Sequence, residues 1–177
     1  HGVHIIKATA GKRGMMAMTA HLIKAFDRDQ STESQQHKLD EALKQLRTII
    51  RPGSLVVVIS DFYNLGKDAK RHLLQLRKHN DVLAIKVSDP FENSLPKPAL
   101  YGVQTGTRPR VLDTKQNRTI KKLHHKQQQH FTALKENIIK AGVPLIPLQT
   151  DHAWVNVLKN SLSNPSLAYS NWLNQWQ

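Results

Sequence analysis

The sequence predicts an α/β fold with a mainly parallel sheet, and two apolar segments separated by a helical one carry that prediction. Residues 54–60 contain five consecutive aliphatic residues, and residues 81–87 contain a second apolar run. Apolar side chains at adjacent positions lie on both faces of a sheet, which is typical of a parallel strand covered by helices on each side. The segment between the two runs repeats its apolar residues at helical spacing. This order predicts parallel strands joined by a right-handed crossover.

The segments before the first buried strand are predicted to be a short strand and two helices. Apolar residues that recur every three or four positions indicate the helices, and Pro52 and Gly53 end the second one just before the strand. In chain order, the prediction is a strand at 4–7, a basic loop at 11–14, a helix at 15–26, a polar loop at 27–36 and a helix at 39–50.

The segments after the first buried strand complete one domain over residues 1–177, with a hairpin insertion around 98–113. Gly142 is the expected C-cap of a long amphipathic helix, because glycine readily adopts the left-handed conformation that ends a helix. In chain order, the prediction is a helix at 69–76, a strand at 81–87, a rigid connector at 95–98, hairpin strands at 100–104 and 109–112, a helix at 118–141, a strand at 144–148, a helix at 154–162 and a short helix at 167–176.

Composition restricts the classes of function. The chain has 26 lysines and arginines against 13 acidic residues, and its net charge of +13 attracts nucleic acid, acidic lipid surfaces or an acidic protein. It contains no cysteine, so disulfides and thiolate sites are excluded, and we expect a cytoplasmic location. No apolar run approaches the roughly 20 residues of a membrane-spanning helix. The chain begins at His1, and we expect it to be a processed product or part of a longer protein.

A carboxylate stands at the end of each predicted interior strand. Asp61 follows the first strand, Asp89 follows the second and Asp151 follows the third. Ligands of open α/β sheets bind at the carboxyl ends of the strands, so these side chains could line one functional edge. The alternative is that each aspartate only caps the turn that follows its strand.

Two stretches of this chain resemble a known family. They are residues 55–62, which end in Ser60-Asp61-Phe62, and residues 79–92, which end in Asp89-Pro90-Phe91-Glu92 and are followed by Leu95-Pro96. Together they are similar to the signature of the bacterial "domain of unknown function 58" family, over about residues 11–151. The resemblance implies a von Willebrand factor A-like domain, which is a three-layer α/β sandwich. It also implies a protein that is often encoded beside MoxR-type AAA ATPases and acts as their adaptor, without catalysis.

A von Willebrand A-like domain often binds Mg²⁺ through oxygen ligands at the top of its sheet, and the resemblance places Asp61 at the last ligand position. The other positions match poorly. The nearest match to the first-strand motif, at residues 29–33, ends in glutamate and follows a helix, and His37 stands where a threonine is expected. We therefore expect no cofactor and weak or absent Mg²⁺ binding, unless a segment upstream of His1 supplies ligands.

The resemblance also implies that two strands of the domain lie upstream of His1. The strand at 54–60 would then have an open edge of unpaired amides and carbonyls, which invites pairing with another chain. We expect self-association or strand exchange.

The function predicted from these observations is a non-catalytic module for protein–protein interaction, with a MoxR-type AAA ATPase as its partner. Its partner-binding rim, the predicted rim, consists of Ser60, Asp61, Phe62, Asp89 and Glu92. Non-specific nucleic-acid binding through the basic surface is the alternative, although aromatic residues make up only 6% of the chain and are not interleaved with the basic pairs. No nucleophile elbow surrounds Ser60, so no enzyme is expected.

Overall fold

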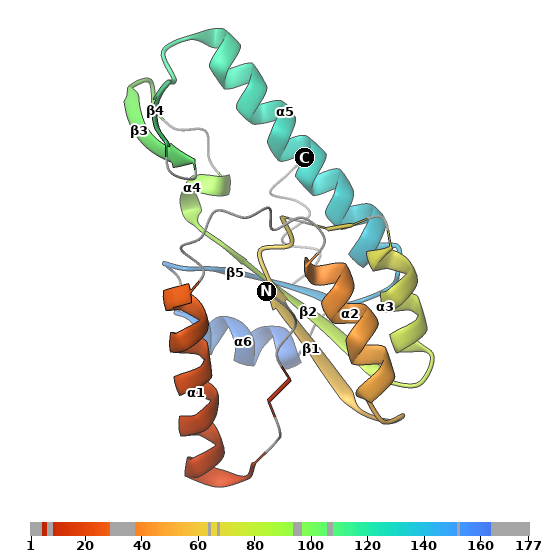
Figure 1. Ribbon diagram of the computed structural model, residues 1–177. Helices are drawn as coiled ribbons and strands as arrows, with labels where there is room; N and C mark the ends of the chain where they lie inside the picture. The colour runs from red at the N-terminus through yellow and green to blue at the C-terminus, as the bar shows by residue number, and fades with distance from the viewer. Residues whose placement is uncertain are drawn as a thin grey trace.

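The computed structural model describes residues 5–6, 9–28, 38–63, 65–66, 68–93, 97–105, 108–151 and 153–163 (Figure 1). None of the helices in these ranges is long and apolar enough to cross a membrane. In chain order the elements are α1 (Gly11–Arg28), α2 (Lys38–Ile49), β1 (Leu55–Ser60), α3 (Ala69–Arg77), β2 (Asp81–Ser88), α4 (Pro90–Asn93), β3 (Leu100–Thr105), β4 (Arg108–Asp113), α5 (Asn117–Leu134), the π-helix η1 (Lys135–Ile139), β5 (Leu145–Gln149) and α6 (Trp154–Ser163).

The main sheet has three parallel strands in the order β1-β2-β5, which confirms the predicted α/β fold with a mainly parallel sheet. Leu55 pairs with Asp81 at the start of β1, and Ala84 pairs with Leu145 at the start of β5. Strands β3 and β4 form the predicted hairpin, an antiparallel pair outside the main sheet (Figure 1). The sequence pattern therefore predicted the parallel pairing of β1 with β2 and the antiparallel pairing of β3 with β4.

Helices cover both faces of the main sheet, so the domain has three layers (Figure 1). On one face, the aliphatic side chains of α2, α3, α5 and η1 pack on Val56, Val82 and Ala84 and form the larger core. On the other face, α6 packs on a smaller cluster around Leu83 and Ile146. This division follows from the alternation of side chains along each strand, which sends successive residues of β2 to opposite layers.

The long helix predicted at 118–141 is formed by α5 and one turn of π-helix, and it ends as predicted at Gly142. Gly142 has φ of +69°. Its amide donates to the carbonyl of Ile139 at 2.7 Å, and the amide of Val143 donates to the carbonyl of Ile138 at 3.1 Å. These bonds satisfy carbonyls that the end of a helix leaves without intrahelical partners.

The N-terminal region requires two corrections. The basic segment at 11–14 is not a loop, because α1 already begins at Gly11 and lysine and arginine are good helix formers. Ile5 and Ile6 belong to no strand, and their side chains are exposed. A strand there would need a neighbouring strand to satisfy its backbone groups. His4, Lys7, most of the predicted loop at 27–36 and the predicted helix at 167–176 lie outside the described residues.

Candidate functional site

The carboxyl end of β1 forms a tight turn held by its own side chains. The amide of Phe62 donates to Ser60 Oγ at 3.0 Å, and the amide of Tyr63 donates to Asp61 Oδ1 at 3.0 Å. Asp61 therefore acts as the cap of this turn, as the simpler sequence interpretation predicted. Its side chain is exposed, so the carboxylate also faces solvent at the end of the sheet.

Phe62 does not belong to the surface on which the predicted rim placed it. Its side chain is only 1% exposed and lies in the core between the sheet and the helices of the larger layer. Its φ is +55°, an unusual conformation for a bulky residue. Burial of the apolar ring favours this inward position, so a partner cannot contact Phe62 directly in this structure.

Asp89 and Glu92 lie just beyond the end of β2 and are exposed. Thr150 Oγ1, from the residue after β5, donates to Asp89 Oδ2 at 3.4 Å, which links the ends of the two strands. Gln127 Nε2 of α5 donates to the backbone carbonyl of Glu92 at 2.7 Å, which links α4 to α5. The parallel strands β1 and β2 thus bring Asp61, Asp89 and Glu92 to one edge of the sheet, and we call these three carboxylates the acidic rim.

Sequence reasoning missed a lysine beneath the acidic rim. Lys86, near the end of β2, is 3% exposed, although its neighbours in the strand are apolar. Burial lowers the pKa of Lys86, and the negative charges of Glu92 and Asp61 raise it in opposition. Among the described residues, no carboxylate forms an ion pair with Lys86. A charged residue inside an otherwise apolar strand was the signal available in the sequence.

The side chain of His130, from α5, lies near Lys86 and Asp61 at the carboxyl end of the sheet. Its ring stacks on Tyr63 with a centroid distance of 4.8 Å, and its Nε2 is buried without a hydrogen-bond partner in the described structure. Burial lowers the pKa of His130, as does the charge of Lys86, whereas the carboxylate and backbone of Asp61 raise it. We call Asp61, Tyr63, Lys86, Glu92 and His130 the Lys86 cluster.

The Lys86 cluster has no donor set for a metal ion. Within the described ranges, no three histidine, aspartate or glutamate side chains lie close enough together to hold one. Residues 29–33 and His37, which the sequence comparison considered as ligand positions, lie outside those ranges. What the cluster supplies is a pair of exposed carboxylates, Asp61 and Glu92, beside a buried cation.

A second charged surface lies on α5. It is an open groove of about 810 Å³, and its lining contains four lysines or arginines and no acidic residue among the described positions. The lining residues are Asn117, Arg118, Lys121, Lys122, His125, Lys126 and Gln129. Because they recur at helical spacing along one face of α5, their charges add to a continuous positive surface. We call this surface the α5 groove.

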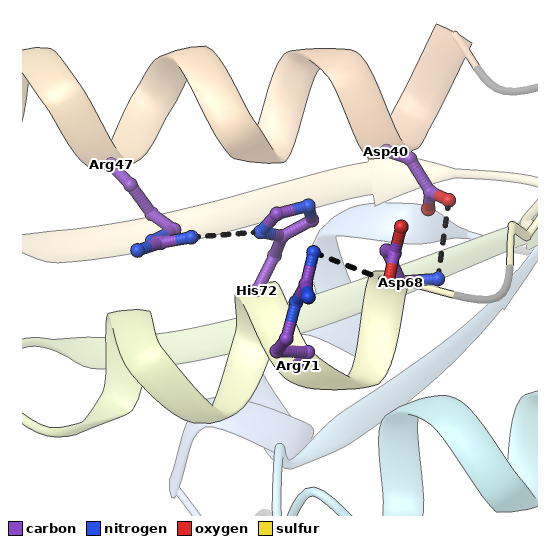
Figure 2. Close-up of polar contacts among 5 residues, drawn as sticks. All are labelled: Asp40, Arg47, Asp68, Arg71 and His72. Carbon is purple, nitrogen blue, oxygen red and sulfur yellow. Dashed lines mark hydrogen bonds and ion pairs between the residues drawn. The ribbon is translucent and has the colours of Figure 1, made fainter.

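A third polar cluster joins α2 to α3 (Figure 2). Arg47 Nη1 of α2 lies 3.0 Å from Nδ1 of the buried His72 of α3. Because arginine has only donors, Nδ1 accepts this bond and the imidazole is neutral. Nearby, Asp40 Oδ2 accepts from the amide of Asp68 at 3.4 Å, and Arg71 pairs with Asp68 at 3.3 Å. The contacts of Arg47 and Asp40 join α2 to α3 and stabilise their packing, whereas the ion pair of Arg71 with Asp68 lies within the first turn of α3.

The neutral His72 predicts that stability depends on pH. Burial and the charges of Arg47 and Arg71 lower the pKa of His72, against opposing effects of Asp40 and Asp68. The unfolded chain therefore takes up this proton first as pH falls. We expect the free energy of unfolding to be highest above about pH 6.5, the ordinary pKa of histidine, and to decrease as pH falls through that value.

Urea unfolding of the wild type and of His72→Gln, measured between about pH 5 and about pH 8, tests this expectation. Glutamine keeps an acceptor for the arginine and does not titrate, so the decrease should be smaller in that variant. His125→Gln, at an exposed position of α5, is the matched control. Equal pH dependence in the wild type and His72→Gln would contradict the assignment.

A family model matches most of this chain. The family model described as "Protein of unknown function DUF58" matches residues 1–133. No curated protein and no solved structure matches this chain. The description of the family assigns no activity, so a function has to be argued from the geometry.

Proposed function

We propose that this chain, which belongs to the family described as "Protein of unknown function DUF58", is a non-catalytic module for protein–protein interaction. The acidic rim is its docking surface. The observation that supports this proposal most is the convergence of three exposed carboxylates, Asp61, Asp89 and Glu92, at the carboxyl edge of the sheet. That edge is the place where open α/β sheets bind their ligands. We place this function in the cytoplasm, in line with a chain without cysteine.

The local charges give the acidic rim its selectivity. The chain as a whole has a net charge of +13, so the acidic rim is a small negatively charged surface on a positively charged protein. A partner with lysine or arginine at its contact would be attracted to the rim and repelled elsewhere, which favours one orientation of docking. The turn at Asp61 and the hydrogen bonds at Asp89 and Glu92 hold the rim in place, which reduces the entropy lost on binding.

The partner we propose is a MoxR-type AAA ATPase, for which this chain would act as an adaptor. The basis is the resemblance of the segments around Asp61 and Asp89 to a family that is often encoded beside such ATPases. The same two segments carry Asp61, Asp89 and Glu92, so the part of the chain that resembles the family is also the part that forms the acidic rim.

A second candidate is non-specific binding of nucleic acid, favoured by the α5 groove. Four cationic side chains on one helix face, without an acidic residue among the described lining, can contact successive phosphates. Each phosphate contact releases counterions, so such binding would weaken steeply with salt. The groove and the acidic rim are separate surfaces, and variants can therefore test them separately.

Capture from a lysate of the source cells, with the immobilised chain as bait and mass spectrometry as readout, tests the first candidate. We expect the wild type to retain a MoxR-type ATPase after nuclease treatment and at moderate salt. Replacing Asp61 and Glu92 together by alanine should reduce its recovery at least tenfold, because two of the three carboxylates of the acidic rim are lost. Asp81→Ala is the matched control, since Asp81 is exposed at the opposite end of β2.

The outcome distinguishes the two candidates. Equal recovery of the ATPase by the double variant, or its absence from all samples, would contradict the docking proposal. Nucleic acid bound to the α5 groove would instead be favoured by two results. Nuclease would remove the captured material, and replacement of Lys121 and Lys122 by glutamate would abolish its capture.

A further inference from the structure

Lys86 is a buried cation without a hydrogen-bond acceptor in the described part of the chain. Its side chain is 3% exposed, and the charges of Glu92 and Asp61 act on it without forming an ion pair or a hydrogen bond with it. An ammonium group has three donors and no acceptor. Because burial of an unpaired charge is costly, an oxygen acceptor beside this group would stabilise it.

The alternation of β2 directs Lys86 into the layer that contains α5. Val82 and Ala84, four and two residues before Lys86, both lie in the larger core, so Lys86 belongs to the same row of side chains. His130 of α5 lies near Lys86 in this layer, and its buried Nε2 has no partner in the described structure. Two nitrogen atoms from different elements are therefore without partners at the carboxyl end of the sheet.

His130 can act as a second donor beside Lys86. Since Nε2 has no partner, Nδ1 is the nitrogen that bonds to the backbone of Asp61. A protonated imidazole donates from both nitrogens, so Nε2 of the protonated ring is a free donor. The ring stacks on Tyr63, whose side chain is 56% exposed, and this contact places the site next to solvent.

The surrounding charges restrict the ligand of these two donors. A lone anion would be attracted by Lys86 and repelled by the exposed carboxylates of Asp61 and Glu92. A lone cation would be attracted by those carboxylates and would leave the ammonium group of Lys86 without an acceptor. A ligand that has a carboxylate close to a basic group satisfies both sets of charges.

We propose that Lys86 and His130 bind a carboxylate of a ligand whose basic group contacts Asp61 and Glu92. This inference rests on the proposed docking function, and the ligand is a segment of the protein partner in which a basic and an acidic side chain are neighbours. The acidic rim attracts the basic side chain, and Lys86 distinguishes this segment from a surface that is only basic. Lys86 is thus a specificity-determining residue of the docking site.

Arginine and agmatine are matched probes of this site, because agmatine is arginine without its carboxylate. A purely acidic surface prefers agmatine, which has the larger net positive charge. We expect the wild type to bind arginine about tenfold more tightly than agmatine, as one hydrogen bond between charged groups would produce. NMR signals of the His130 ring measure both affinities at about pH 6.5, the ordinary pKa of histidine. Bound arginine should also raise the pKa of His130, on which the charges of Lys86 and Asp61 act.

Variants of the full chain locate the effect. Lys86→Met should lose the preference for arginine, whereas Lys122→Met, at an exposed position of α5, should keep it. Circular dichroism checks that both variants are folded. Equal or tighter binding of agmatine by the wild type, no binding of either probe, or an unchanged preference in Lys86→Met overturns the proposal.

The same probes separate this proposal from the docking function itself. Agmatine binding that is lost when Asp61 and Glu92 are both replaced by alanine, without any preference for arginine in the wild type, would leave the acidic rim as a docking surface. It would also show that Lys86 takes no part in recognition. Retention of the ATPase by the wild type in the capture experiment tests the docking function independently of either probe.

Discussion

Phe62→Ala is expected to lower the free energy of unfolding by about 3 to 5 kcal/mol. The ring of Phe62 is 1% exposed and lies in the larger core, so its removal loses apolar burial and leaves a cavity. The strain of its left-handed backbone remains in the alanine variant, because alanine also disfavours a φ of +55°. Since domains of this size are stable by about 5 to 15 kcal/mol, the loss would be a large fraction of the total.

Equilibrium urea unfolding measures this loss. Tyr63→Ala is the matched control, because Tyr63 is the adjacent aromatic residue, is exposed and would lose its stacking on His130. Such a stacking contact contributes about 0.5 to 1.5 kcal/mol. If Phe62→Ala cost no more than Tyr63→Ala, the interior position of Phe62 would be wrong, and its place in the predicted rim would be restored.

Lys86→Met is expected to stabilise the protein at neutral pH by about 1 to 4 kcal/mol, the gain found when apolar residues of similar volume replace other buried ionic groups. Lys86 is 3% exposed in an otherwise apolar strand, and methionine fills a similar volume without a charge to desolvate. The attraction of Glu92 and Asp61 opposes the effect of burial on the pKa of Lys86 without exceeding it. Lys86→Arg keeps the charge and should give no gain.

A second readout of Lys86→Met is the titration of His130. The charge of Lys86 is one cause that lowers the pKa of His130, so that pKa should rise when the lysine is replaced. NMR titration of the His130 ring measures this shift. A loss of stability together with an unchanged titration would show that the two side chains do not interact. A gain of stability with loss of ATPase capture would indicate that Lys86 is retained for binding.

The candidate site was predictable only in part. Asp61, Asp89 and Glu92 could be placed at one edge from the sequence, because each follows a strand whose apolar run is unmistakable. Lys86 and His130 could not be brought together, since they lie on different elements and meet only because α5 packs over the end of β2. The sequence places Phe62 on the predicted rim because it follows Asp61 at the end of a strand, and position in the chain does not determine burial in a turn.

The sequence by itself determined the α/β class, the parallel pairing of β1 and β2, the hairpin and the cap at Gly142. These features depend on periodicity and on single residues with special backbone preferences, which act locally. Only the tertiary structure decided that Phe62 is buried and that Lys86 lies beneath the acidic rim. Periodicity tells which side chains share a face, whereas the packing of distant elements decides what, if anything, covers that face.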